Sequence, residues 1–387
     1  MTDGAPGPPR KRRPRYAGTH PRRFAEKYKE RDAARYPEER AKVIASGKTP
    51  AGSHVPVLVA EVLEALAPAP GDVAVDATLG FGGHASEILR KILPGGRLLA
   101  LDVDPIELPK AAARLEALAR ELGSPGAVKT EKRNFAGLRK LLDEEGLARG
   151  ADAILADLGV SSMQLDDPER GFSWKQDVPL DLRMNPGRGQ PAGNLLLRMK
   201  REEIEDLLRR WGDEPEAAGI ATHLAEAARA AALQDADEPR TSTSDSHLLR
   251  NSSFPLPFLR TSDVTRAVDL AYEGRTSRDA SEAKKSSLQR TFQAIRILVN
   301  DELTALDAFL RDLPFCLAPG GRAAILTFHS GEDRRVKKAF KAGLESGLYA
   351  RIADEVVRAT PEERGKNPRS SAAKLRWAVR ADRSLPG

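Results

Sequence analysis

Apolar β-type runs and amphipathic helical stretches alternate along the chain from His54 to Val160. A strand that is followed by a crossover helix and then by another strand forms a parallel, right-handed unit. We therefore predict an α/β fold built on a doubly wound parallel sheet, with helices on both faces. The expected strands are residues 72–80, 96–104, 128–135 and 151–160, and the expected helices are residues 57–66, 84–93, 106–122 and 135–145.

The alternation stops after Val160, and residues 161–289 contain no convincing buried strand. Helical patterns and Gly/Asp/Pro-rich loops fill this stretch instead. We predict an inserted, mainly helical substrate-recognition domain over 166–288, with mobile loops at about 234–262 and at 274–287. The sheet pattern resumes with a long helical pattern from Arg290, so that residues 51–165 and 289–387 form one α/β domain.

The basic charge of the chain lies at its N-terminus. Residues 1–50 hold 14 Lys and Arg against 6 Asp and Glu, whereas the rest of the chain holds 48 against 50. This arm is rich in Pro, Arg and Glu and poor in apolar periodicity, which predicts that it is largely disordered. A run such as RKRRPR is typical either of a phosphate-binding arm or of a solvated terminus.

Composition excludes several classes of protein. No apolar run approaches the roughly 20 residues of a membrane span, and no apolar segment follows the N-terminal basic residues as in a secretory signal. Cys316 is the single cysteine, so we expect a core residue and no disulfide-linked partner. No His, Cys and Asp residues have metal-ligand spacing, so we expect no metal. The prediction is a cytoplasmic protein with no membrane partner, of undetermined oligomeric state.

A glycine-rich segment, DATLGFGGH, follows the first predicted strand and begins a helix. Gly82 and Gly83 allow close approach to a ligand at the carboxyl edge of the sheet. Asp102 ends the second strand, where a carboxylate can accept hydrogen bonds from ribose hydroxyls. The segment lacks the G-x-G-x-x-G spacing of pyrophosphate sites, which favours an adenosine ligand without a pyrophosphate and argues against a nicotinamide-dependent oxidoreductase. A turn without any ligand is the alternative.

Phe135 follows the third predicted strand, and Asp157 ends the fourth. An aromatic ring at the first of these positions suits packing against adenine, although a plain core role is equally compatible. The ends of parallel strands meet at one edge of the sheet. The four strand ends together therefore indicate one binding site.

Several segments in this order resemble the bacterial 16S rRNA (cytosine-N4) methyltransferase family: DATLGFGGH, DLGVSSMQLDDPERGFSW, RTFQAIRILVNDEL and FHSGEDRRVK. The resemblance covers most of residues 54–380. It implies a class I (Rossmann-like) methyltransferase fold, S-adenosyl-L-methionine as cofactor, and 16S rRNA in the small ribosomal subunit as partner. Carried over by motif, the cofactor-binding residues are Gly82, Gly83, His84, Asp102, Phe135, Asp157 and Gln164, of which His84 and Gln164 come from the resemblance alone.

The same resemblance implies methyl transfer to the N4 amine of a decoding-centre cytosine. Asp157 is our candidate for the group that accepts a hydrogen bond and a proton from that amine. His329 is a second candidate for the catalytic site, with a satisfied buried histidine as the alternative. Trp174 stacks on the target base or serves as a core residue. Another nucleic-acid amine as substrate, or a non-catalytic RNA-binding or ribosome-assembly factor, remain the alternative functions.

Overall fold

The computed structural model describes residues 56–237, 259–275 and 278–382. The predicted basic arm at residues 1–50 and the middle of the loop predicted at 234–262 lie outside these ranges. Both ends of that predicted loop are helical, because helix α10 (Ala217–Asp237) ends within it and helix α11 (Thr261–Ala271) begins within it.

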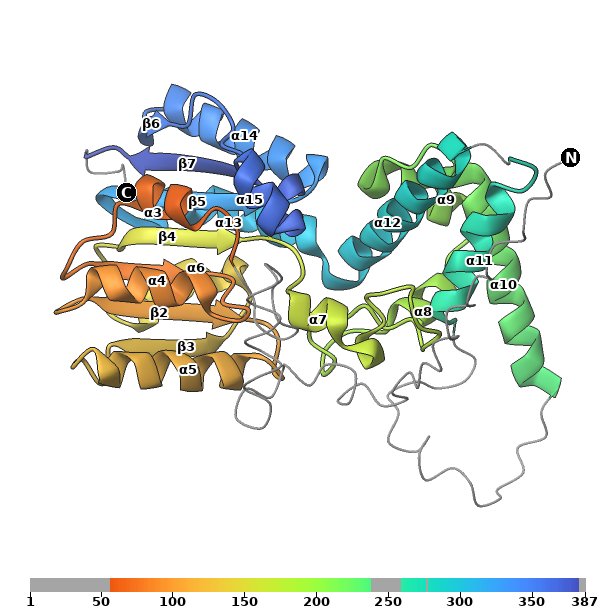
Figure 1. Cartoon of the computed structure of the whole chain (residues 1–387), viewed down its shortest axis with the longest axis horizontal. Helices are drawn as coiled ribbons and strands as arrows, with labels where there is room; N and C mark the ends of the chain where they lie inside the picture. The colour runs from red at the N-terminus through yellow and green to blue at the C-terminus, as the bar shows by residue number, and fades with distance from the viewer. Residues whose placement is uncertain (1–55, 238–258, 276–277, 383–387) are drawn as a thin grey trace, which may run out of the picture. The chain divides into compact units, whose positions relative to one another are not determined.

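A seven-stranded sheet organises the fold, in the order β3-β2-β1-β4-β5-β7-β6 (Figure 1). The first five strands in this order pair in parallel, and β7 pairs antiparallel with both β5 and β6. The strands are β1 Val73–Asp76, β2 Arg97–Asp102, β3 Val128–Lys132, β4 Ala151–Asp157, β5 Leu317–Thr327, β6 Tyr349–Ile352 and β7 Lys374–Arg380. The predicted α/β class is confirmed, and the sheet order reverses between β1 and β4.

Side chains that alternate along each strand supply two separate cores. In β1, Ala74 packs with one face and Val75 with the other, and the same alternation runs through Leu98 and Leu99 in β2. Helices α3 Val59–Leu66, α4 Gly83–Ile92 and α5 Leu108–Glu121 contribute to the first core. Helices α6 Leu138–Glu144, α13 Glu302–Cys316 and α14 Ser330–Glu345 contribute to the second. The sheet is thus covered on both faces, as a parallel sheet requires.

A third apolar core lies among the helices that interrupt the sheet pattern. These are α7 Ser162–Asp166, α8 Ala192–Leu196, α9 Arg201–Gly212, α10 Ala217–Asp237, α11 Thr261–Ala271 and α12 Arg278–Asn300. Within the described part of this stretch, the only β pairing is an isolated bridge between Pro179 and Arg260. The helical content agrees with the sequence pattern.

The prediction of a loop over 274–287 is wrong from Arg278 onward, because α12 begins there. The sequence there, RDASEAKKSS, is polar on nearly every side and carries little apolar periodicity. Ser287 and Leu288 are nevertheless buried, and Leu288 joins the third core. Packing at the far end of the helix therefore stabilises a first half that composition alone assigns to a loop.

The long helical pattern from Arg290 also divides into two helices. Helix α12 ends at Asn300, and α13 begins at Glu302. Between them Asp301 has φ 51° and ψ 40°, a left-handed conformation that aspartate tolerates better than most side chains. This single residue ends the helix of the third core and begins a helix that packs on the sheet.

The smaller elements complete the described chain: 3-10 helices η2 Phe135–Gly137, η3 Pro168–Arg170 and η4 Pro368–Ala372, and helix α15 Pro361–Lys366. Cys316 is buried in the second core, and burial raises the pKa of its thiol to about 12. A thiol with so high a pKa is a poor nucleophile at neutral pH. Within the described ranges, no helix has both the length and the apolar character needed to cross a bilayer.

Candidate active site

A pocket of about 1410 Å³ lies at the carboxyl ends of β1, β2 and β4. Its wall also includes residues of α12, α13 and the loop between η3 and α8. Small-molecule sites usually have volumes of about 300 to 1,000 Å³. This pocket therefore has room for a cofactor and for part of a second molecule.

The glycine turn after β1 is set by backbone geometry. Gly80 has φ 49° and Gly82 has φ 84°, both in the left-handed region that glycine adopts without strain. A Cβ on Gly83 would lie 3.0 Å from Cγ of Pro56, so this position also requires a glycine or a shift of the proline ring. Gly83 lines the pocket. Gly82 does not line it, but forms the N-cap of α4 and so directs the turn.

The Asp102 carboxylate fixes the edge of β2 against this turn. Its Oδ2 accepts a hydrogen bond from the Gly80 amide over 2.7 Å, and its Oδ1 accepts one from the Asp104 amide over 2.9 Å. Burial raises the pKa of Asp102. A carboxylate has about four lone-pair positions, so two remain for the ribose hydroxyls of a ligand in the pocket.

Gln164 reaches the pocket from helix α7, where its side chain has two internal partners. Oε1 accepts a hydrogen bond from the Ser161 amide over 3.0 Å and so completes a capping box. Nε2 donates to Oδ2 of Asp104 over 2.9 Å. Gln164 is only 6% exposed, and these contacts hold α7 against the β2 end.

The same Asp104 carboxylate accepts a hydrogen bond from Arg170, a buried side chain of η3. The Nη2 of Arg170 donates to the carbonyl oxygens of Arg183 and Met184, over 3.0 and 2.8 Å. Arg170 thus connects the β2 end to the loop that forms another wall of the pocket. Nothing in the sequence pattern indicated this long-range contact.

Phe135 begins the 3-10 helix after β3 and lines the pocket. Its ring packs edge-on against Phe309 of α13, with ring centroids 5.4 Å apart. The ring thus supports the second core and also lines the pocket, and its packing against adenine stays a prediction. Asn134 caps the helix by accepting a hydrogen bond from the Ala136 amide.

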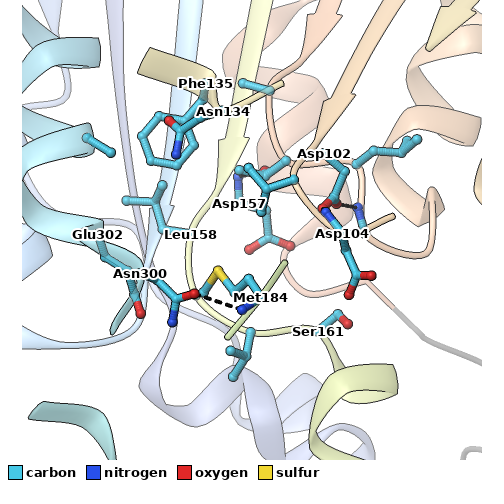
Figure 2. A pocket seen from close by; sticks show the side chains of 18 of the residues that line it. Asp102, Asp104, Asn134, Phe135, Asp157, Leu158, Ser161, Met184, Asn300 and Glu302 are labelled. Carbon is cyan, nitrogen blue, oxygen red and sulfur yellow. Dashed lines mark hydrogen bonds between the residues drawn. The ribbon is translucent and has the colours of Figure 1, made fainter. Parts of the chain in front are cut away.

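Asp157 lies in the middle of the site. Figure 2 shows its carboxylate between Asp102 and Asp104 on one side and Met184 and Asn300 on the other. Its backbone amide donates to Oγ1 of Thr78 over 2.6 Å, which fixes the end of β4. Burial, and secondarily the charge of Glu332, raises the pKa of Asp157 to about 7. The side chain is 20% exposed, so it is available to a ligand in the pocket.

His84 lines the pocket from the first turn of α4, and both of its ring nitrogens face other groups of the protein. Nε2 lies 2.8 Å from the carbonyl oxygen of Val57, and Nδ1 lies 3.5 Å from Oδ2 of Asp157. Burial lowers the pKa of the imidazole. Ligand contacts at this position therefore fall to the backbone or to the face of the ring.

His329 follows β5, but it is not among the residues that line the pocket. Its Nε2 lies 3.2 Å from Oε1 of Glu332, one turn along α14. Glu332 itself lines the pocket, is 3% exposed, and accepts a hydrogen bond from the Phe328 amide. Sequence reasoning proposed His329 and missed Glu332. The two residues are three apart at the start of a helix, and this spacing was the signal that could have identified the glutamate.

Asn300 stabilises the part of the pocket wall that lies across from Asp102 (Figure 2). Its Oδ1 accepts a hydrogen bond from the Met184 amide over 2.7 Å (Figure 2). Its Nδ2 donates to the Leu182 carbonyl over 2.8 Å. Leu182 has φ 60°, an unfavourable conformation for a leucine. The asparagine therefore acts as a clamp that keeps the loop in place, and sequence reasoning missed it.

Three further residues near the loop between η3 and α8 have structural partners. Asp181 and Arg183 form a buried ion pair, with Nε to Oδ1 at 2.6 Å and Nη2 to Oδ2 at 2.9 Å. Trp174 packs against Phe292 at the third core, with ring centroids 5.6 Å apart. Neither the ion pair nor Trp174 lines the pocket. In the ranges that the structure covers, no group of three or more His, Cys, Asp or Glu side chains is placed to hold a metal ion.

The sheet order and the strand-end carboxylates define a class I methyltransferase. The residues present fit an adenosyl group. Asp102 faces the pocket and can accept further hydrogen bonds, Phe135 offers a ring, and Gly80 and Gly83 line the pocket without side chains. The chain belongs to the MraW methylase family, and the match to that family covers residues 51–381. Its cofactor is S-adenosylmethionine.

Relatives of this chain align over nearly their whole length. The chain is 43% identical to the ribosomal RNA small subunit methyltransferase H 1 of Lachnoclostridium phytofermentans over 374 residues, covering 97% of this chain and 94% of the relative. It is also 43% identical to methyltransferase H 2 of Alkaliphilus metalliredigens, covering 96% and 98%. A solved S-adenosylmethionine-dependent O-methyltransferase from Thermotoga maritima has 10% identity and a TM-score of 0.34, covering 85% of this chain and 66% of that chain.

Proposed function

We propose that this methylase transfers a methyl group from S-adenosylmethionine to the N4 amine of a cytosine in the decoding centre of 16S rRNA. The names of its relatives support small-subunit rRNA as the substrate. The motifs that resemble the cytosine-N4 family support the base and the atom. The observation that carries the proposal is the Asp157 carboxylate, which is buried yet open to the pocket.

An exocyclic cytosine amine is a weak nucleophile, because its lone pair is delocalised into the ring. S-Adenosylmethionine supplies an electrophilic methyl group on a sulfonium. The protein must align the amine and remove a proton from it. A carboxylate with a pKa of about 7, as Asp157 has, is half ionised near neutral pH and is suited to both tasks.

The binding of the base requires space and a wall that holds its position. The pocket volume leaves room beyond an adenosyl group, and the wall held by Asn300 and Arg170 lies opposite the β2 end. Enzymes that modify a base take it out of its stack and enclose it. Met184, which lines the pocket from this wall, is our candidate for the apolar surface on which the base rests.

Four exposed basic side chains line the pocket: Lys132, Lys140, Arg188 and Arg369. Basic groups around the pocket favour a polyanionic substrate, because they neutralise phosphates on either side of the target nucleotide. This arrangement supports RNA over a free nucleoside. An rRNA substrate implies that the protein acts in the cytoplasm.

The test is transfer of labelled methyl groups from S-adenosylmethionine to small ribosomal subunits that lack this modification, followed by digestion to nucleosides. We expect label in N4-methylcytidine. Label in any other nucleoside would overturn the proposed substrate atom. Cofactor binding without any transfer would favour the non-catalytic alternative, an RNA-binding or assembly factor.

Asp157→Asn tests the proposed proton acceptor in the same assay. The amide keeps the size of the side chain but cannot take a proton. We expect kcat at saturating S-adenosylmethionine to fall by about 100-fold or more, which is the usual contribution of general base catalysis. A change in cofactor affinity with normal kcat at saturation would assign Asp157 to the cofactor site alone. Near-normal turnover would remove Asp157 from this role.

A further inference from the structure

The tautomer of His84 follows from its partner on one side. Nε2 lies 2.8 Å from the carbonyl oxygen of Val57, and a carbonyl oxygen only accepts hydrogen bonds. Nε2 therefore carries the hydrogen. In the neutral imidazole this leaves Nδ1 with a lone pair and no proton.

Nδ1 points at the group proposed to receive the reaction proton. It lies 3.5 Å from Oδ2 of Asp157, close enough for a proton to pass after a small movement of either side chain. A lone pair that faces a carboxylate is a repulsive arrangement, which one added proton converts into a hydrogen bond. The pair is thus built to hold a single proton between two acceptors.

We propose that His84 is the proton partner of Asp157 in methyl transfer, an inference that rests on the proposed function. The amine nitrogen forms a bond to the methyl carbon, the carbon–sulfur bond breaks, and its electron pair stays on sulfur. The nitrogen then loses one proton to the Asp157 carboxylate. That proton is shared with Nδ1 of His84, and it leaves to solvent when the product leaves the pocket.

The groups that surround the pair favour an added proton. His84 is faced by Asp76 of β1, by Glu363 of α15 and by the Val57 carbonyl, while Asp157 is faced by Asp76 and by Glu332 of α14. His329 and Arg296 of α12 interact with Glu332 and offset its charge, so the acidic groups that favour the added proton are Asp76 and Glu363. Burial lowers the pKa of His84 and raises the pKa of Asp157 to about 7, so near neutral pH the imidazole is neutral and ready to accept.

His84→Gln is the informative variant. A glutamine amide nitrogen occupies nearly the place of Nε2, so it keeps the hydrogen bond to Val57 while it removes Nδ1. We expect kcat to fall by about 10- to 100-fold, with the KM for the ribosomal subunit and the affinity for S-adenosylhomocysteine within about threefold. Because protonated Asp157 loses an acceptor, the apparent pKa of the acid limb of the pH–rate profile should fall by about 0.5 to 1 unit.

Ser86→Ala is the matched control in the first turn of the same helix. It removes the hydrogen bond from Ser86 to the Gly82 carbonyl but leaves both contacts of His84 in place. We expect its rate and pH profile to equal those of the parent within about threefold. An equal loss in both variants would mean that His84 is only structural, and would overturn the proposal.

The other outcomes are also decisive. A parent enzyme that makes no N4-methylcytidine refutes the proposed function, whereas normal kcat and an unshifted pH profile in His84→Gln refute this inference alone. A loss of cofactor affinity with normal kcat at saturation would assign His84 to binding and overturn it too. If the variant folds poorly, the ¹⁵N shifts of the His84 ring in the parent provide the test: a proton on Nδ1 rather than Nε2 above pH 8 would contradict the proposal.

Discussion

Arg170 donates a hydrogen bond from Nη1 to Oδ2 of Asp104 over 3.0 Å, and both side chains are buried. Because the other terminal nitrogen of Arg170 holds the carbonyls of Arg183 and Met184, one guanidinium joins the end of β2 to the opposite wall of the pocket. Arg170 therefore stabilises both Asp104, beside the proposed cofactor site, and Met184, the proposed surface for the target base.

Replacement of Arg170 by Met should disturb this support. Removing one partner of a buried ion pair costs about 3 to 5 kcal/mol, and Asp104 keeps Gln164 as a donor, so we expect a loss near 3 kcal/mol in the free energy of unfolding. Urea denaturation measures it. Arg210→Met is the control, because Arg210 forms an exposed helix pair with Asp206 and should change stability by less than about 0.5 kcal/mol. Equal stability of the two variants would contradict the prediction.

Asn300→Asp should weaken substrate binding selectively. The new carboxylate would face the Leu182 and Arg296 carbonyls, to which the amide now donates, and would repel both. The wall at Met184 should shift, raising the KM for the ribosomal subunit by about tenfold or more, the effect of one unsatisfied buried group. Cofactor affinity should stay within about twofold, since Asn300 has no contact with the β2 end.

Gln176→Glu makes the same change of charge at an exposed position of the inserted segment and serves as the control. It should leave both constants unchanged. An Asn300→Asp enzyme whose KM matches that of Gln176→Glu would show that the clamp has no part in substrate binding.

Asp102→Asn should reduce cofactor affinity. The carboxylate accepts hydrogen bonds from two backbone amides and faces the pocket, and an asparagine offers a donor in place of one acceptor. Hydrogen bonds to a charged group contribute about 1.5 to 3 kcal/mol, so the Kd for S-adenosylhomocysteine should rise by about 10- to 100-fold in calorimetry. Asp72→Asn, before β1 and so at the opposite edge of the sheet, should leave the Kd unchanged. A Kd for Asp102→Asn within twofold of the parent would exclude Asp102 from the cofactor site.

The Asp76 carboxyl should make the protein less stable as the pH rises. Burial raises its pKa from 3.8 to about 7, so between these values the folded chain binds a proton that the unfolded chain has lost. Stability from this group is therefore full below pH 4 and falls as the pH passes through 7. Between pH 5 and pH 8 the loss is on the order of 2 kcal/mol.

Asp76→Asn keeps an oxygen acceptor for the Thr78 amide but cannot titrate. Its free energy of unfolding should fall less than that of the parent between pH 5 and pH 8. Parallel pH profiles for the two proteins would refute the assignment.

Strand alternation predicted the sheet and therefore the meeting of Asp102, Phe135 and Asp157, because strand ends in a parallel sheet share an edge. The same pattern could not predict the contacts of Asn300 with Leu182 or of Arg170 with Asp104, since both join segments far apart in sequence. They depend on how the third core packs, and pattern reasoning does not give that packing.

Two errors have local physical reasons. The sequence DASEAKKSS is polar on nearly every side, so its composition predicts a loop. The structure has a helix there, because the later turns of α12 pack into the third core. The break at Asp301 is invisible to periodicity, because apolar residues continue at helical spacing on both sides of it. The partners of His84 likewise join segments far apart in sequence, Val57 before α3 and Asp157 at the end of β4, which no motif encodes.

The left-handed residue between α12 and α13 also fixes the number of residues at this junction. Asn300 clamps the pocket wall and Glu302 pairs with Arg296, so both neighbours of Asp301 have assigned partners. One inserted residue would turn α13 by about 100° about its axis. Leu306, Phe309 and Leu313 would then rotate off the sheet as the clamp shifted. The length of this junction therefore fixes how the sheet and the helices of the third core are oriented about each other, and changes in length there should be far less tolerable than substitutions.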